Sequence, residues 1–159
     1  MTDTVKAAFW MIGSIVFFSA MAVAGREVRA VHDTFEIMFY RSLIGVVIVL
    51  SVVVATGKTG EIRTQRFGLH AVRNLAHFTG QNLWFYALPL IPLAQAFALE
   101  FTSPLWALIF APLVLAEPVT RIRVFAAGIG ILGILVLTRP FSEPLTLGVL
   151  AAAAAAVGF

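Results

Sequence analysis

One acidic side chain in the middle of a long apolar stretch is the residue most open to chemical use. Glu100 lies within the apolar run 93–116, which is long enough to cross a membrane. A charge at the centre of a bilayer costs roughly 2.5–3.5 kcal/mol on insertion scales, so a passive anchor has no need of one. Two interpretations stay open: a carboxylate that couples proton movement to transport, or a structural partner for Arg41 or His77.

A face of polar and aromatic side chains on the preceding apolar run is the second candidate. Spacings of three and four residues place its members on one side of a helix. They are Asn74, His77, Phe78, Gln81 and Phe85. Polar groups on one face of a membrane helix point away from lipid, toward protein or water. The face therefore either lines a substrate pathway or supplies interhelical hydrogen bonds, which contribute about 0.6 kcal/mol each.

Further polar groups and a proline lie in the same run as Glu100. Gln95, Thr102 and Trp106 share one helical face, and we expect all three to line the cavity with Glu100. Pro104 frees backbone groups that hydrocarbon cannot hydrate, so neighbouring helices or a wet cavity must satisfy them. We predict that this run forms the wall of a pathway and that Pro104 has a structural or gating role.

Other conspicuous residues are assigned roles outside the cavity. Trp10, Trp84 and Tyr86 are candidates for lining a cavity, but we expect them at the membrane interface, which is the commoner place for such rings. Glu117 ends the run at a helix C-terminus, where the dipole disfavours a negative charge, so we predict a structural or gating latch with a nearby cation. Arg41 lies early in its run, where its long stem can reach the headgroups, and is also predicted to be structural.

The composition places these residues in a membrane protein. The chain has 159 residues, of which 60% are hydrophobic and 12% charged, and its mean hydropathy is +0.97. Soluble domains carry about 25% charged residues. We therefore predict an all-α fold, a polytopic bundle of transmembrane helices.

Several classes of protein are excluded by the same sequence. The net charge is +3, but the basic residues stand singly between apolar runs, so we predict no nucleic-acid binding. The chain has no cysteine, which excludes disulfides and thiolate chemistry. Asp3 and Asp33 lie outside the apolar runs, and neither an HExxH nor a GxSxG motif occurs. We predict no enzyme, no metal site and no cofactor.

Six apolar runs are separated by polar connections. They cover residues 7–24, 35–55, 70–90, 93–116, 122–138 and 145–159. Small residues at 22–24 resemble a signal-peptide cleavage site, but the further runs favour a first transmembrane helix. The sixth run has no charged flank, and we expect it to begin a helix that continues past Phe159. The chain thus divides into a five-helix unit, residues 1–140, and the start of a sixth helix, residues 141–159.

The fifth run has a glycine-rich face. Gly128, Gly130 and Gly133 recur within it. Because small residues let helix backbones come together, we expect another helix to pack closely against this run.

The distribution of basic residues predicts the orientation of the chain. With a cytoplasmic N-terminus, the basic residues on or near the inside are Lys6, Lys58, Arg63, Arg66, Arg73, Arg121 and Arg123. Those on or near the outside are Arg26, Arg29, Arg41 and Arg139. The excess inside favours a cytoplasmic N-terminus in the inner membrane.

The ordered set of features resembles one repeat of the drug/metabolite transporter superfamily, in its EamA-like branch. The resemblance covers residues 7–138. The residues that match are Arg41, the segment 85–88, Ala94, Ala96 and Ala98 before Pro104, Glu117 after it, and Gly128 to Gly133. It implies two five-helix repeats of inverted topology around a central cavity, with alternating access. Glu100 and the polar face of the third run depart from the general pattern of this family.

The resemblance implies a transporter of amino-acid-like, vitamin or drug-like solutes, commonly moved outward. Its expected partners are a small-molecule substrate, the lipid bilayer, and a missing C-terminal repeat or a second copy of the chain. Two alternatives stay open: a complete five-helix transporter that acts as a homodimer, and a structural membrane subunit that transports nothing. The structural subunit would explain the glycines but not the costly polar face.

Overall fold

The computed structural model describes residues 3–61, 65–115, 118–138 and 145–159. Within these ranges the chain forms α-helices and one 3₁₀ turn, and no strand, which confirms the all-α prediction. The helices are α1 (Asp3–Val28), α2 (Thr34–Ala55), α3 (Phe67–Ala87), α4 (Leu93–Glu100), α5 (Ser103–Leu115), α6 (Arg121–Thr138) and α7 (Leu147–Gly158), with the 3₁₀ turn at Thr59–Glu61.

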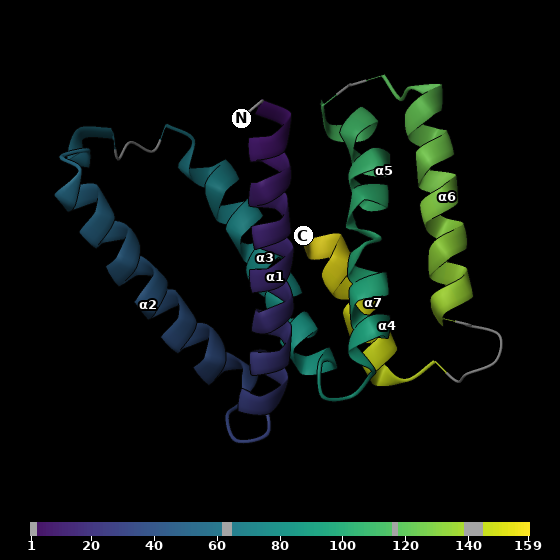
Figure 1. The fold of residues 1–159 in the computed structure, drawn as a ribbon, viewed down its shortest axis with the longest axis horizontal. Helices are drawn as coiled ribbons and strands as arrows, with labels where there is room; N and C mark the ends of the chain where they lie inside the picture. Colours follow the sequence, from purple (N-terminus) through teal and green to yellow (C-terminus); the bar gives the residue numbers. More distant parts are fainter. Residues whose placement is uncertain (1–2, 62–64, 116–117, 139–144) are drawn as a thin grey trace.

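The helices form a bundle that is packed at one end and spread at the other (Figure 1). α2 leans away from α1, and α5 and α6 lie side by side on the opposite flank. α7 lies between these groups, where it packs mainly against α3 and next against α4. The last helix of the chain is therefore part of the centre of the bundle.

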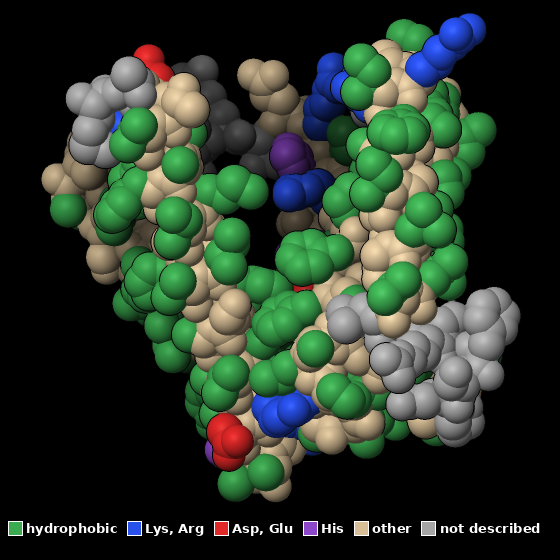
Figure 2. Space-filling model, turned by 45° about the vertical axis from the view of Figure 1, so that its right-hand side comes forward, with side chains coloured by type: hydrophobic (Ala, Val, Ile, Leu, Met, Phe, Trp, Pro, Cys, Tyr) green, Lys and Arg blue, Asp and Glu red, His purple; other side chains and the backbone are tan. Residues whose placement is uncertain are grey.

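Three segments among the described residues are long and apolar enough to cross a membrane. They are α1, α2 and the stretch Leu93–Val114, which α4 and α5 form together. Their large apolar side chains face outward, with Phe9 at 68% exposure, and Figure 2 shows broad apolar surfaces on the columns of helices. So large an apolar surface is unfavourable in water, whereas it is compatible with contact to lipid tails. The fold is thus a polytopic membrane bundle.

The run around Glu100 is not one helix, as the sequence suggested, but two. α4 ends at Glu100, and α5 begins at Ser103. Pro104 has no N–H to donate to the Glu100 carbonyl, and the Ser103 Oγ donates to that carbonyl instead, at 2.7 Å. The Thr102 Oγ1 similarly donates to the Leu99 carbonyl at 2.7 Å. Hydroxyl groups thus satisfy the break, which makes it tolerable at membrane depth.

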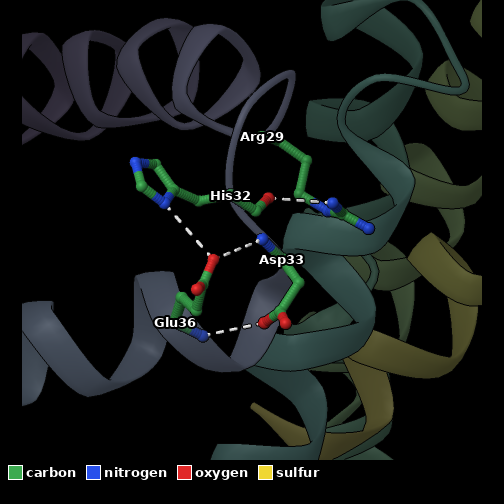
Figure 3. A network of polar contacts seen from close by, with 4 residues as sticks. All are labelled: Arg29, His32, Asp33 and Glu36. Carbon is green, nitrogen blue, oxygen red and sulfur yellow. Dashed lines mark hydrogen bonds and ion pairs between the residues drawn. The ribbon is translucent and has the colours of Figure 1, made fainter.

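The turn between α1 and α2 is fixed by a small polar network (Figure 3). Asp33 and Glu36 form a capping box, in which the Glu36 N–H donates to Asp33 Oδ1 at 2.9 Å and the Asp33 N–H donates to Glu36 Oε2 at 3.1 Å. His32 Nδ1 lies 3.2 Å from the same Glu36 oxygen, and Arg29 donates to the His32 carbonyl at 2.9 Å. These contacts begin α2 and set the direction in which it leaves α1.

α3 and α7 cross through small residues at very short range. A Cβ added at Gly80 would lie 3.0 Å from the Ala155 carbonyl oxygen, and one added at Gly158 would lie 2.8 Å from the Ala76 carbonyl oxygen. Buried alanines of α7 continue this surface, and Ala152 has no exposed area. The alanine run thus serves as a flat surface that lets two backbones meet.

The glycines of α6 do not have the role that the sequence predicted. No heavy atom lies within 4 Å of the position that a Cβ would take at Gly128, Gly130 or Gly133. Within the described residues the expected close approach is therefore absent, and that prediction is wrong for this part of the chain. The close approaches occur instead where α7 meets α3, because small residues face each other on both helices there.

The packed end of the bundle is held by Arg26, the last basic residue of α1. Its Nε donates to the Leu88 carbonyl at 2.7 Å, and its Nη2 donates to the Ile91 carbonyl. The neighbouring Gly25 is buried under Phe85 and Leu88, which leaves no room for a side chain. The end of α1 is thereby fixed to the α3–α4 turn, and the helices diverge from there toward the other end (Figure 1).

Candidate functional site

A pocket of about 500 Å³ lies between α1, α2, α3 and the end of α4. It is lined by Phe17, Phe18, Met21, Arg41, His77, Gln81, Trp84, Phe85, Glu100 and Phe159. Figure 2 shows the molecule hollowed between its columns of helices, with basic and histidine side chains beside the hollow. Aromatic rings thus form much of the wall, and a few polar groups converge on the same space.

The pocket brings together several of the residues that the sequence singled out. Four predicted cavity residues line it, namely His77, Gln81, Phe85 and Glu100. Arg41, which was given a structural role, lines it as well. These residues come from three different helices and are up to 59 positions apart in the chain, counted from Arg41 to Glu100. Folding therefore makes one site from two separate sequence patterns.

A second pocket of about 500 Å³ adjoins the first. Trp106 and Pro104, both predicted site residues, line it together with Arg73. His77 and Phe159 line both pockets, and their rings meet edge to face at 5.4 Å between centroids. The two pockets therefore share this ring pair as part of their walls.

Other predicted cavity residues are placed away from both pockets. Asn74 is exposed, and the Phe78 ring lies tilted against that of Phe35, with ring centroids 6.5 Å apart. Gln95 is half-buried, and Thr102 is engaged in the break between α4 and α5. The polar face is therefore wider than the part of it that lines the two pockets.

One predicted latch residue lies outside the described part of the chain. Glu117 falls in the gap between α5 and α6. The predicted boundary between residues 140 and 141 falls in a second gap, before α7. Their roles stay predictions.

Glu100 is half-buried and forms no ion pair with any residue in the described part of the chain. Among the described residues the ion pairs are Lys6–Asp3 and His32–Glu36. Neither Arg41 nor His77 pairs with Glu100, although all three line one pocket. The Glu100 Oε2 atom is buried and makes no regular hydrogen bond to any described residue, although the Trp84 indole acts on this carboxyl as a donor. Of the two interpretations of this acid, structural pairing is not realised in this conformation.

Trp84 is a residue that the sequence interpretation misplaced. It was assigned to the membrane interface, but it is only 2% exposed and lies in the core. Its ring packs edge-on against Phe85, at 5.3 Å between centroids, and tilted against Phe18, at 5.6 Å. A signal was present, because Trp84 follows Gln81 by three positions and therefore shares the polar face of α3. By contrast, Trp10 is 73% exposed and faces outward.

The Trp84 indole and the Glu100 carboxyl form the polar centre of the pocket. The Trp84 indole is close enough to the Glu100 carboxyl to donate a weak hydrogen bond to it. The geometry is irregular, so neither Trp84 Nε1 nor Glu100 Oε2 makes a regular hydrogen bond among the described residues. Glu100 is also the last residue before the helix break. Transporters commonly place solute sites at such interruptions of membrane helices. The arrangement suits binding of a small organic solute.

The model of the EamA-like transporter family matches residues 5–139. A riboflavin transporter of Brucella anthropi is 37% identical over 110 residues, which are 69% of this chain and 38% of that protein. An S-adenosylmethionine uptake transporter of Rickettsia conorii is 30% identical over 150 residues, 94% of this chain and 51% of that protein.

A third relative has a different named activity. The pseudopaline exporter CntI of Pseudomonas aeruginosa is 30% identical over 125 residues, 79% of this chain and 43% of that protein. No solved structure matches the chain significantly. The chain spans about half the length, or less, of the curated relatives it matches. The match along most of its length confirms the resemblance drawn from the sequence: this multi-pass membrane protein belongs to the EamA-like transporter family of the drug/metabolite transporter superfamily.

Proposed function

We propose that this chain is one half of a transporter that moves a small metabolite through the pocket at Glu100. One observation carries the proposal: an aromatic-walled pocket of about 500 Å³ contains a half-buried carboxyl group, in no ion pair with a described residue, at a break in a membrane helix. That volume falls in the range of sites for small organic ligands, roughly 300–1,000 Å³. The cost of such a carboxylate in a membrane is readily explained by a solute that pairs with it.

The proposed mechanism is alternating access. The bundle is fixed at the end where Arg26 binds the α3–α4 turn and is spread at the other end. Rocking of the helices around the pocket would open the fixed end and close the spread one. The His77–Phe159 ring pair would act as an inner barrier between the two pockets.

A second five-helix unit is proposed to complete the pathway. An odd number of helices in one repeat places the next repeat in inverted topology. The relatives are about twice as long as the segments matched in them, which supports a second unit supplied by the same polypeptide or by another copy of the chain. Sequencing the gene past the codon for Phe159 and cross-linking the protein in membranes would decide between these two arrangements.

The direction of transport and the orientation are also proposals. We propose outward transport, because members of the family commonly export their solutes. The relatives include both an uptake transporter and an exporter by name. We propose an inner-membrane location with a cytoplasmic N-terminus, because the basic residues favour it. The spread end of the bundle would then face the cytoplasm, since the N-terminus lies there (Figure 1). Reporter fusions at both termini would test the orientation.

The transport proposal is tested with labelled riboflavin and S-adenosylmethionine in cells that express the protein. The named activities of the relatives motivate these two solutes. Transport above that of cells without the protein is expected for at least one solute, together with a large loss in Glu100→Leu. Gly128→Ala is the matched control, because nothing lies within 4 Å of that position. Equal transport by the Glu100 variant and the control would contradict the proposed pathway.

A further inference from the structure

We infer that the pathway binds an anionic group of the solute, a carboxylate or a phosphate, through a row of basic side chains on α3. This inference rests on the proposed function and names the charge of the substrate for that same pathway. The basic row consists of Arg66, His70, Arg73 and His77. It begins at the N-cap of α3, at the spread end of the bundle, and ends at the two pockets (Figure 1).

The basic row lies on the face of α3 that points into the bundle. Spacings of four, three and four residues keep its members within an arc of about 60° around the helix. Gly80, where α3 meets α7, and Trp84, which lies in the core, continue the same face. The exposed apolar residues Val72 and Leu75 lie on the other side of the helix. The basic row therefore faces the pathway and not the lipid.

No acidic residue offsets the basic row within the described part of the chain. Its members form no ion pair there, and α3, α5 and α7 contain no aspartate or glutamate. Arg73 and His77 line the second pocket, whose described lining includes no acid. Arg41 adds a further cation at the first pocket, where Glu100 is the acid. Figure 2 shows basic and histidine side chains beside the hollow, so a solute would meet positive charge before it reached Glu100.

Helix stability does not account for cations at these positions. Arg66 is the N-cap residue of α3 and makes no side-chain capping hydrogen bond. The helix dipole favours an anion at this end, so it opposes Arg66 and adds to the attraction for an anionic solute. Arg73 lies about 9 Å along the helix from Phe67, at 1.5 Å per residue. A charge at such depth is costly and typically marks a solute pathway.

A bound anion would offset this cost. The guanidinium of an arginine such as Arg73 can hold a carboxylate or a phosphate with two parallel hydrogen bonds. The sign of the charge also separates candidate solutes, because a basic approach attracts anions and repels cations. S-adenosylmethionine carries a positive net charge at neutral pH. We therefore expect this chain to prefer an anionic solute, although one relative is named for S-adenosylmethionine.

Equilibrium binding to the purified full chain in phosphatidylcholine nanodiscs tests the inference without any need for transport. The probes are two matched pairs, riboflavin with riboflavin 5′-phosphate and adenosine with adenosine 5′-monophosphate, and the members of each pair differ only by the phosphate. We expect the phosphorylated member of at least one pair to bind about 10- to 100-fold more tightly, the factor associated with hydrogen bonds to a charged group. The preference should decline as salt is raised toward about 1 M, because ions screen charges that water can reach.

Variants of the protein assign the preference to the basic row. Arg73→Gln removes the cation and keeps a polar side chain, so we expect the preference for the phosphorylated probe to fall about tenfold. Affinity for the neutral member should not change, which separates loss of anion binding from loss of structure. Arg73→Lys keeps the charge and should retain part of the preference. Arg121→Gln, the same change at the start of α6, is the matched control, and circular dichroism shows whether each variant keeps its helices.

A second set of nanodiscs separates a solute from a lipid headgroup as the source of the anion. These discs contain phosphatidylglycerol, whose headgroup is an anionic phosphate. We expect the preference for the phosphorylated probe to persist in them. Its disappearance there, at the same salt concentration, would assign the basic row to lipid headgroups and overturn the inference.

The possible outcomes separate the two proposals. Equal binding within both pairs, tighter binding of the neutral members, or no binding of any probe overturns the inference, even where transport of a neutral solute is measured. The expected preference in binding, without transport of any tested solute, supports anion recognition and contradicts the transport proposal.

Discussion

The close crossing of α3 and α7 predicts that Gly80→Ala destabilises the protein. The added Cβ would lie 3.0 Å from the Ala155 carbonyl oxygen and 3.3 Å from two backbone atoms of Gly158. These neighbours are helix backbone and cannot rotate away, so α7 must move by a few tenths of an ångström. Overpacking of this kind costs about 1–3 kcal/mol. The better helix propensity of alanine offsets about 0.5–1 kcal/mol of that cost.

The matched control is Gly128→Ala on α6. Apart from the backbone of α6 itself, no heavy atom of the described residues lies within 4 Å of the added Cβ there, so only the propensity gain applies. The two variants should therefore differ by about 1–3 kcal/mol in the free energy of unfolding. A difference of 1 kcal/mol corresponds to about 2–4 °C in melting temperature for a chain of this size.

Thermal unfolding in detergent micelles, followed by circular dichroism at 222 nm, measures this difference. Gly158→Ala should behave like Gly80→Ala, because its Cβ would lie 2.8 Å from the Ala76 carbonyl oxygen. The double variant should lose less than the sum of the two single losses, since helices already separated by one methyl group have room for the next. Equal melting temperatures for Gly80→Ala and Gly128→Ala would refute the packing argument.

Three further predictions concern the turns and the pocket. Arg26→Gln should lower the free energy of unfolding by about 2 kcal/mol, measured as above, because two backbone carbonyls lose a charged donor; an unchanged melting temperature would show that the turn holds without it. Asp33→Ala should cost about 1 kcal/mol through loss of the N-cap of α2, and Asp33→Asn, which retains the cap, should cost much less. Glu100→Gln should reduce the pH dependence of transport, because an amide cannot take up the proton that a coupling carboxylate would carry. His77→Asn separates the contribution of the histidine, and an unaltered profile in Glu100→Gln would assign coupling to another group.

Much of the fold could be predicted from the sequence because hydrocarbon restricts what a chain can do. A long apolar run must satisfy its own backbone, so it becomes a helix, and the runs at 7–24 and 35–55 became α1 and α2. The break after Glu100 was harder to place. Pro104 indicated an irregularity in the helix. Whether a proline kinks a helix or divides it depends on the groups that can donate to the freed carbonyls, which here are the hydroxyls of Ser103 and Thr102.

The site was predicted only in part because periodicity gives the face of a helix and not its neighbour. His77, Gln81 and Phe85 were placed on one face of α3, and they do line one pocket. Trp84 was assigned to the membrane interface because tryptophan is enriched there. That enrichment carries no information on which side chains pack against this particular ring. The glycines of α6 failed for the same reason, since a small residue permits close contact but does not supply the partner.

The central position of α7 has a consequence for how the protein is made. The ribosome completes α3 well before α7, yet α3 packs against α7 more than against any other helix. Until residues 147–158 emerge, the small-residue surface around Gly80 must contact lipid or a component of the insertion machinery. Membrane insertion of α3 and its packing against α7 are therefore separate stages, and the second waits until α7 has been synthesised.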